Sequence, residues 1–60
     1  MNSTLCESVA VLGLAGFRLL AIIIDGERVK YRTETREGRR YVFRASLDEV
    51  VSVGEGVRER

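Results

Sequence analysis

Residues 28–45, RVKYRTETREGRRYVFRA, carry the clearest structural pattern in the chain. Charged and uncharged side chains alternate from Arg28 to Thr35, as they do in a β-strand that buries one face. The segment Arg36-Glu37-Gly38 follows and places glycine where a three-residue hairpin loop needs a left-handed backbone. We therefore predict a β-hairpin with strands at about residues 28–35 and 39–45.

The position of this loop also predicts the register of the hairpin, because residues directly opposite each other then have numbers that sum to 74. One face carries uncharged pairs: Val29 with Ala45, Tyr31 with Phe43, and Thr33 with Tyr41. The other face carries the charged side chains: Lys30 with Arg44, Arg32 with Val42, and Glu34 with Arg40. Aromatic side chains on one face and cations on the other make this register self-consistent.

A further strand is predicted at about residues 17–24, where the chain is rich in Ile and Leu and stops at the hairpin signal Asp25-Gly26. Regular alternation places four apolar residues on one face: Phe17, Leu19, Ala21 and Ile23. The other face then carries three apolar residues and one arginine: Leu20, Ile22, Ile24 and Arg18. A strand that is apolar on both faces is normally covered on both, and one short helix can cover only one of them.

The N-terminal segment predicts a short helix at about residues 4–13. Thr4 and Glu7 fit a capping box, with threonine as the N-cap. Leu5, Val9 and Leu12 follow at helical spacing. Cys6 flanks this stripe, and we expect it to be a small buried apolar residue rather than a reactive thiol.

The C-terminal element, at about residues 47–53, has two interpretations. Ser46 and Glu49 fit a second capping box, which predicts one helical turn. The valines of residues 49–53 favour a fourth strand instead. We expect the last residues, 57–60, to be a frayed tail.

These elements predict one small α+β domain over residues 1–60, with a short N-terminal helix packed on a three-stranded antiparallel meander. The composition agrees, since 45% of the residues are apolar and 32% are charged, with no proline. Such values exclude collagen-like and charge-swollen disordered chains. A disulfide scaffold is excluded as well, because Cys6 is the only cysteine.

The sequence offers little for catalysis, and we expect a protein that is not an enzyme. It has no histidine, and its single cysteine and its serines lack a recognisable base, so no catalytic residue is predicted. No metal ligands, cofactor or small-molecule substrate are predicted either. The apolar stretch at residues 9–24 contains Arg18 and is shorter than the roughly 20 residues of a membrane span, so we expect a cytoplasmic protein without a membrane partner.

Two surfaces remain as candidates for binding. The leftover apolar face of the first strand, Phe17, Leu19, Ala21 and Ile23, predicts self-association into a homo-oligomer or contact with a protein partner. Residues 28–44 contain seven Arg or Lys and two Glu, so the basic charge is local. The alternative is therefore weak, sequence-independent nucleic-acid binding by the cations of the hairpin: Arg28, Lys30, Arg32, Arg40 and Arg44.

Residues 31–59 resemble the strand–turn–strand half of HicB-type antitoxins. The resemblance lies in the hairpin segment at residues 36–42, REGRRYV, and in Val51-Ser52-Val53-Gly54, which is similar to the family's Val-Ser-x-Gly stretch before a helix. It implies an antitoxin-like protein that binds a small toxin ribonuclease. We keep this as a third alternative and identify the chain with no family.

Overall fold

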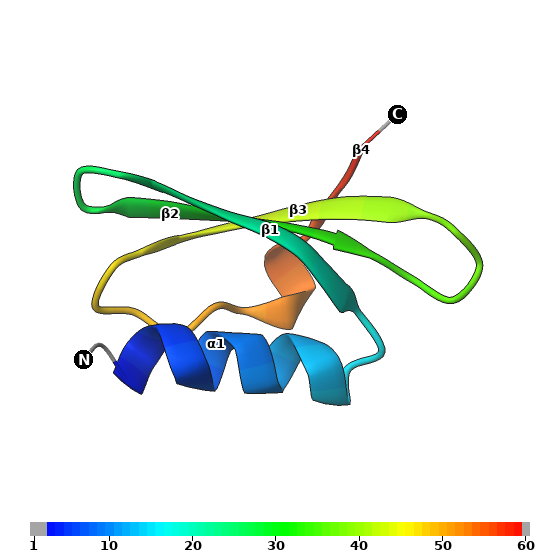
Figure 1. Cartoon of the computed structure of the whole chain (residues 1–60), viewed down its shortest axis with the longest axis horizontal. Helices are drawn as coiled ribbons and strands as arrows, with labels where there is room; N and C mark the ends of the chain where they lie inside the picture. Colours follow the sequence, from blue (N-terminus) through cyan, green and yellow to red (C-terminus); the bar gives the residue numbers. More distant parts are fainter. Residues whose placement is uncertain (1–2, 60) are drawn as a thin grey trace.

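One helix and an antiparallel four-stranded sheet make up the computed structural model, which describes residues 3–59 (Figure 1). The elements in chain order are α1 (Ser3–Leu14), β1 (Arg18–Asp25), β2 (Arg28–Glu34), β3 (Arg40–Ser46), the short 3-10 helix η1 (Val53–Glu55) and β4 (Val57–Glu59). The strand order is β1-β2-β3-β4, and α1 lies along one face of the sheet. The predicted α+β fold, a helix on an antiparallel meander, is confirmed, with β4 as a fourth strand.

The central hairpin, β2 and β3, has the predicted register at every pair. Tyr31 lies opposite Phe43 and Lys30 lies opposite Arg44. Gly38 has a φ of 83°, the left-handed conformation that its place in the loop requires. The backbone N–H of Thr35 donates to the Arg39 carbonyl at 2.8 Å and closes the loop. Local pattern and loop chemistry are therefore sufficient to define this part of the fold.

The strand β1 contains a bulge that the sequence pattern did not predict. Leu19 lies opposite Thr33, but Ala21 lies opposite Arg32, so Leu20 is an extra residue in the ladder. The predicted grouping of Phe17, Leu19, Ala21 and Ile23 on one face is therefore wrong. Because directly opposite residues share a face, Leu19 lies on the side of α1, whereas Ala21 and Ile23 lie on the basic side.

The helix α1 ends in a Schellman motif. Gly16 has a φ of 93°, its N–H donates to the Gly13 carbonyl at 3.1 Å, and the Phe17 N–H donates to the Leu12 carbonyl at 2.9 Å. This motif turns the chain back towards the sheet. Phe17 then packs against the core, with its ring edge-on to the rings of Tyr41 and Phe43 at centroid distances of 5.4 and 4.9 Å.

Two predictions for the helix are wrong in detail. The helix begins at Ser3, so Thr4 lies in its first turn and is not the N-cap. Cys6 is exposed rather than buried, so its place beside the apolar stripe of α1 does not bring it into the core.

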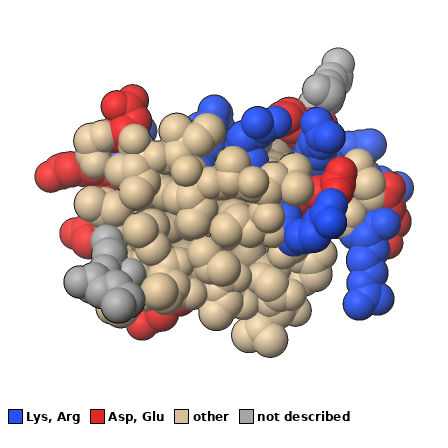
Figure 2. All heavy atoms as spheres, in the orientation of Figure 1, with Lys and Arg blue, Asp and Glu red and all other residues tan. Residues whose placement is uncertain are grey.

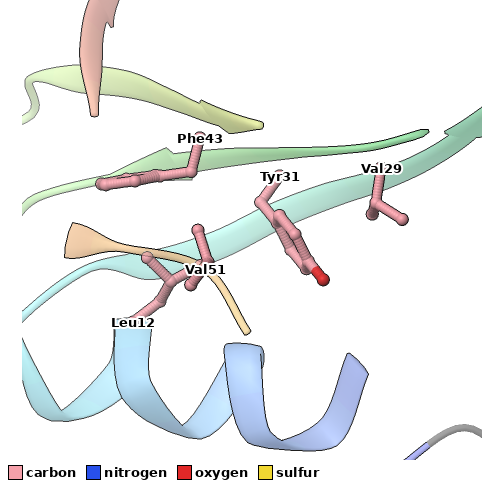
Figure 3. Packing of buried hydrophobic residues seen from close by; sticks show 5 residues of the cluster. All are labelled: Leu12, Val29, Tyr31, Phe43 and Val51. Carbon is pink, nitrogen blue, oxygen red and sulfur yellow. The ribbon is translucent and has the colours of Figure 1, made fainter. Parts of the chain in front are cut away.

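The core lies between the central hairpin and α1. Its fully packed members are Leu12, Val29, Tyr31, Phe43 and Val51 (Figure 3). The Tyr31 side chain is completely buried, and its hydroxyl has no hydrogen-bond partner among the described residues. Leu12 and Val51 fill the space between α1 and the rings of the hairpin, so the helix and the C-terminal segment share one core.

The C-terminal segment differs from both interpretations of the sequence. Residues 47–52 form neither a helix nor a strand, and the Ser46–Glu49 motif closes a turn through the Glu49 N–H and the Ser46 carbonyl at 3.1 Å. The segment passes between α1 and the sheet, buries Val51, and forms β4 at Val57–Glu59, where we expected a frayed tail. β4 pairs with β3, since Val57 lies opposite Val42 and Glu59 opposite Arg40. The single turn η1, which joins residues 47–52 to β4, directs the chain to the β3 side of the sheet (Figure 1).

A buried hydrogen bond ties the C-terminal segment to α1. The Val51 N–H donates to the Ser8 Oγ at 3.0 Å, and Ser8 is completely buried. We expect Ser8→Ala to lower the free energy of unfolding by about 1–3 kcal/mol, because the Val51 N–H is left without an acceptor. Urea unfolding followed by circular dichroism measures this loss.

The control for this substitution is Ser52→Ala, since the exposed Ser52 makes no side-chain cap hydrogen bond. This change should alter stability by less than about 0.5 kcal/mol. Equal effects of Ser8→Ala and Ser52→Ala would contradict a stabilising role for the buried bond.

The backbone at Gly56 lies directly against the Phe43 ring. A Cβ at this position would stand 2.5 Å from Cε2 and 2.6 Å from Cζ of Phe43, whose ring is itself buried. Gly56→Ala should therefore destabilise the fold by about 1–3 kcal/mol through overpacking. Gly54→Ala is the matched control, because no atom lies within 4 Å of a Cβ there. Thermal unfolding of both variants tests the prediction, which fails if the two melting temperatures are alike.

Candidate interaction surfaces

Four large apolar side chains on β1 are exposed, and we call them the apolar edge. Their exposed fractions are 41% for Leu20, 38% for Ile22, 43% for Ile23 and 54% for Ile24. Only Ala21 interrupts them in the sequence, so they form one continuous apolar strip along β1 rather than scattered surface residues. Contiguous exposed apolar groups of this kind mark interaction sites in soluble proteins.

The apolar edge extends over both faces of β1. Ile22 and Ile24 lie opposite Tyr31 and Val29, on the side of α1, whereas Ile23 lies opposite Lys30 on the basic side. β1 is the first strand of the sheet, and no described strand pairs with its outer side. In an antiparallel ladder, alternate residues direct their N–H and C=O groups away from the partner strand. The edge therefore presents both apolar side chains and free backbone groups.

Figure 2 shows the molecule from the side on which β1 crosses in front of the other strands. Uncharged surface spans the middle of this view, over β1 and α1. Lys and Arg side chains gather along its upper and right margins, and acidic side chains lie at the left and among these cations. The apolar edge is thus framed by charge of both signs.

The structure separates the four residues predicted for self-association. Phe17 and Leu19 are half-buried and pack against the core, and Ala21 is half-buried on the basic side. Only Ile23 belongs to the apolar edge. Leu20, Ile22 and Ile24 were not predicted as binding residues, because regular alternation assigned them to the covered face. The signal for these three residues in the sequence was the uninterrupted apolar run of the strand, because such a run places apolar side chains on both faces.

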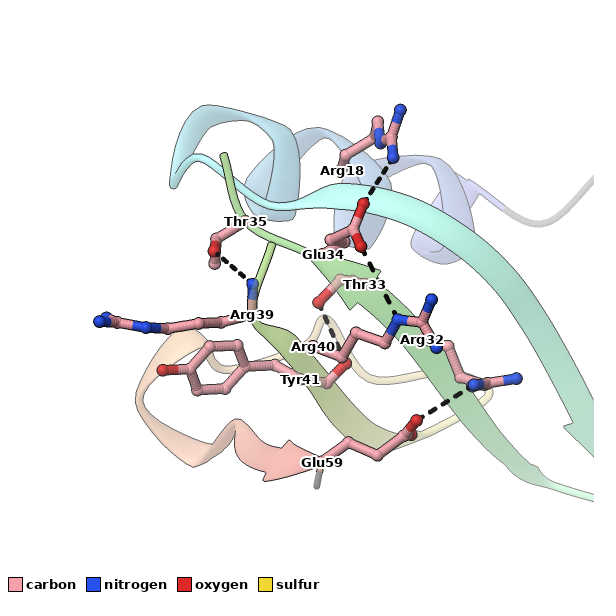
Figure 4. Close-up of polar contacts among 9 residues, drawn as sticks. All are labelled: Arg18, Arg32, Thr33, Glu34, Thr35, Arg39, Arg40, Tyr41 and Glu59. Atoms are coloured by element: carbon pink, nitrogen blue, oxygen red, sulfur yellow. Dashed lines mark hydrogen bonds and ion pairs between the residues drawn. The ribbon is translucent and has the colours of Figure 1, made fainter. Parts of the chain in front are cut away.

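The basic face of the sheet lies opposite α1. The register places all five predicted cations on it, from Arg28, Lys30 and Arg32 on β2 and from Arg40 and Arg44 on β3. Acidic side chains on the same face neutralise part of this charge (Figure 4). The ion pairs are Arg18–Glu34 at 2.6 Å, Arg40–Glu34 at 3.7 Å and Arg32–Glu59 at 3.1 Å.

Three of the cations have no ion pair among residues 3–59: Arg28, Lys30 and Arg44. Lys30 and Arg44 lie directly opposite each other, a like-charge pair that disfavours the sheet unless solvent or an anion screens it. Tyr31, Tyr41 and Phe43 lie on the other face, where Tyr31 and Phe43 are buried. The basic face therefore has charge but no aromatic side chains on which bases could stack.

Residues 3–59 contain no group of three or more His, Cys, Asp or Glu side chains placed to hold a metal ion. In the same part of the chain, no helix has the length and apolar character needed to cross a membrane.

No family model, curated protein or solved structure matches the chain in comparisons with known proteins. The segment at residues 51–54 is similar to the stretch before a helix in HicB-type antitoxins, but here its last two residues already belong to the single turn η1, and the strand β4 follows. The arrangement of the surface residues therefore carries the functional argument.

Proposed function

We propose that the protein is a non-catalytic interaction module that self-associates through β1. One observation carries this proposal: the edge strand β1, whose outer side pairs with no described strand, exposes four large apolar side chains, Leu20, Ile22, Ile23 and Ile24. Strand addition at such an edge satisfies the free backbone groups and buries the side chains in the same step. The proposal includes a cytoplasmic location, where the exposed thiol of Cys6 would stay reduced.

The other edge of the sheet, formed by β4, is less able to pair with a strand of another molecule. β4 has three residues, two of which are charged, Arg58 and Glu59. Short charged strands at an edge discourage pairing with another chain. The eight-residue β1 has charged residues only at its two ends, so it is the edge that favours association.

The strength of this association can be estimated from burial. Complete burial of an Ile or Leu side chain contributes about 1.5–3 kcal/mol, so a side chain that is half exposed has about 1 kcal/mol left to gain. Eight such side chains in a pair of molecules would supply about 8 kcal/mol, against an association cost of roughly 4–15 kcal/mol. The balance favours association by at most about 4 kcal/mol, so we expect a weak complex with a dissociation constant of about 1 mM or above.

Replacing an apolar side chain of β1 by lysine tests this proposal. We expect light scattering to give a mass that rises above the monomer's 6.7 kDa as the protein concentration is raised to several millimolar. Ile23→Lys should return the mass to the monomer value, because the ammonium group cannot be buried in the contact.

The control is Val57→Lys, the same kind of change on the opposite edge strand, where Val57 is 58% exposed. This variant should keep the mass of the wild type. A wild-type mass that stays near 6.7 kDa throughout the concentration series would overturn self-association.

The second candidate function is weak, sequence-independent nucleic-acid binding by the basic face. The observation that favours it is the unpaired group Arg28, Lys30 and Arg44, in which Lys30 and Arg44 lie side by side across two strands. Cα atoms across an antiparallel pair lie about 4.5–5.5 Å apart, so the two side chains concentrate positive charge at one place, where it can contact phosphates. Binding here would rest on phosphate contacts alone.

Salt-dependent fluorescence anisotropy with a short labelled RNA and a DNA duplex tests this second candidate. Three phosphate contacts predict a log–log salt slope of about two to three in magnitude. The double substitution Lys30→Glu and Arg44→Glu should abolish binding, whereas Arg36→Glu with Arg39→Glu, an equal charge change in the exposed hairpin loop, should retain most of it. Absence of binding at about 50 mM salt would remove this candidate.

A further inference from the structure

We propose that β1 pairs with β1 of a second copy, antiparallel, about a two-fold axis that passes between the two Ile22 residues. This inference rests on the proposed function and adds to it the partner and the register. It follows from the bulge in β1 and from the positions of the two charged residues at the ends of the strand.

The bulge brings Arg18 and Asp25 to the same face of the sheet. In a regular strand, residues seven positions apart point to opposite faces. Here Arg18 lies opposite Glu34 and Asp25 lies opposite Arg28, and both partners belong to the basic face of β2. The extra residue Leu20 thus turns β1 into a strand with one cation and one anion on the same side.

The bulge also makes Ile22 the midpoint between these two charges. Ile22 lies opposite Tyr31, which is three ladder positions from the partner of Arg18 and three from the partner of Asp25. A two-fold axis at Ile22 therefore places Arg18 of each copy opposite Asp25 of the other. The strand is self-complementary in charge in this register.

The charged groups are free to form these contacts. The Arg18 side chain is 74% exposed even though it contacts Glu34, so part of its guanidinium remains available. Asp25 is exposed and makes no ion pair with any of residues 3–59. Two reciprocal Arg18–Asp25 pairs would close the two ends of the contact.

The apolar side chains between the charges are also complementary in this register. Ile24 lies opposite Leu19 of the second copy on the side of α1, and Ile23 lies opposite the small Ala21 on the basic side. The two-residue loop makes Asp25 and Arg28 a hydrogen-bonded pair, so the alternation of the ladder directs the backbone groups of Ile22 and Ile24 outward. The two Ile22 residues can then exchange backbone hydrogen bonds at the axis.

Charge-swapped variants mixed with each other test the register. Arg18→Asp and Asp25→Arg should each weaken dimerisation about tenfold or more, because both ends of the contact then hold like charges. An equimolar mixture should form a heterodimer with an affinity within about threefold of the wild type. The control Arg36→Asp, a loop substitution outside β1, should leave the affinity of dimerisation unchanged. Circular dichroism should show that each variant keeps the wild-type fold.

Cysteine cross-linking provides a second test that does not alter charge. In a Cys6→Ser background, Ile22→Cys should form a disulfide-linked dimer on mild oxidation, since Cα atoms of a hydrogen-bonded pair lie about 5.5 Å apart. Ile24→Cys should not, because the two copies of residue 24 would be separated by four ladder positions, about 13 Å.

The outcomes separate this inference from the proposed function. A wild-type protein that is a monomer at every concentration overturns both. The register alone is overturned by a different result: Ile23→Lys disrupts the dimer, the charge mixture gives no rescue, and Ile24→Cys cross-links in preference to Ile22→Cys. Association through β1 then still stands. Rescue by the mixture together with cross-linking at Ile22→Cys supports the paired register.

Discussion

The contact between Tyr31 and Phe43, directly opposite each other across the central hairpin, is the packing unit on which the other elements depend. Leu12 of α1 and Val51 of the C-terminal segment belong to the same buried cluster, and the Phe17 ring meets Phe43 edge-on. The chain at Gly56 crosses so close to the same ring that it has no room for a Cβ. Helix, first strand and C-terminal segment are therefore positioned by one pair of aromatic side chains on β2 and β3.

β1 is left exposed because the helix and the C-terminal segment both pack over the central strands. A 60-residue chain buries only about 60% of the surface that its extended form exposes, so its core is small. Here α1 and the segment at residues 47–56 lie over the hairpin, and Val29, Tyr31 and Thr33 of β2 are almost completely buried. No described segment remains to cover Ile22 and Ile24 at the edge. The apolar edge is thus what the packing of the described residues leaves exposed.

The hairpin could be predicted from the sequence residue by residue, whereas the bulge in β1 and the strand β4 could not, and the reason is physical. In β2 the alternation of charged and uncharged residues identifies the faces, and Gly38 locates the loop. In β1 both faces are apolar, so alternation contains no information about where Leu20 interrupts the ladder. β4 is recognisable only through its pairing with β3 and through the contact of Glu59 with Arg32, both of which join residues far apart in sequence. The placement of the five cations on one face was accordingly predicted correctly, whereas the grouping of the apolar residues of β1 on one face was wrong.

The two surfaces differ in what the fold already does to stabilise them. Arg18, Arg32 and Arg40 each contact a glutamate, and the three remaining cations are solvated at little cost. Nothing among the described residues compensates the exposed isoleucines, each of which still has about 1 kcal/mol to gain from burial. The apolar edge therefore has the stronger driving force. Pairing through β1 about an axis normal to the sheet would leave both basic faces on one side, so association would not obstruct the cations, and the two surfaces are compatible in a single assembly.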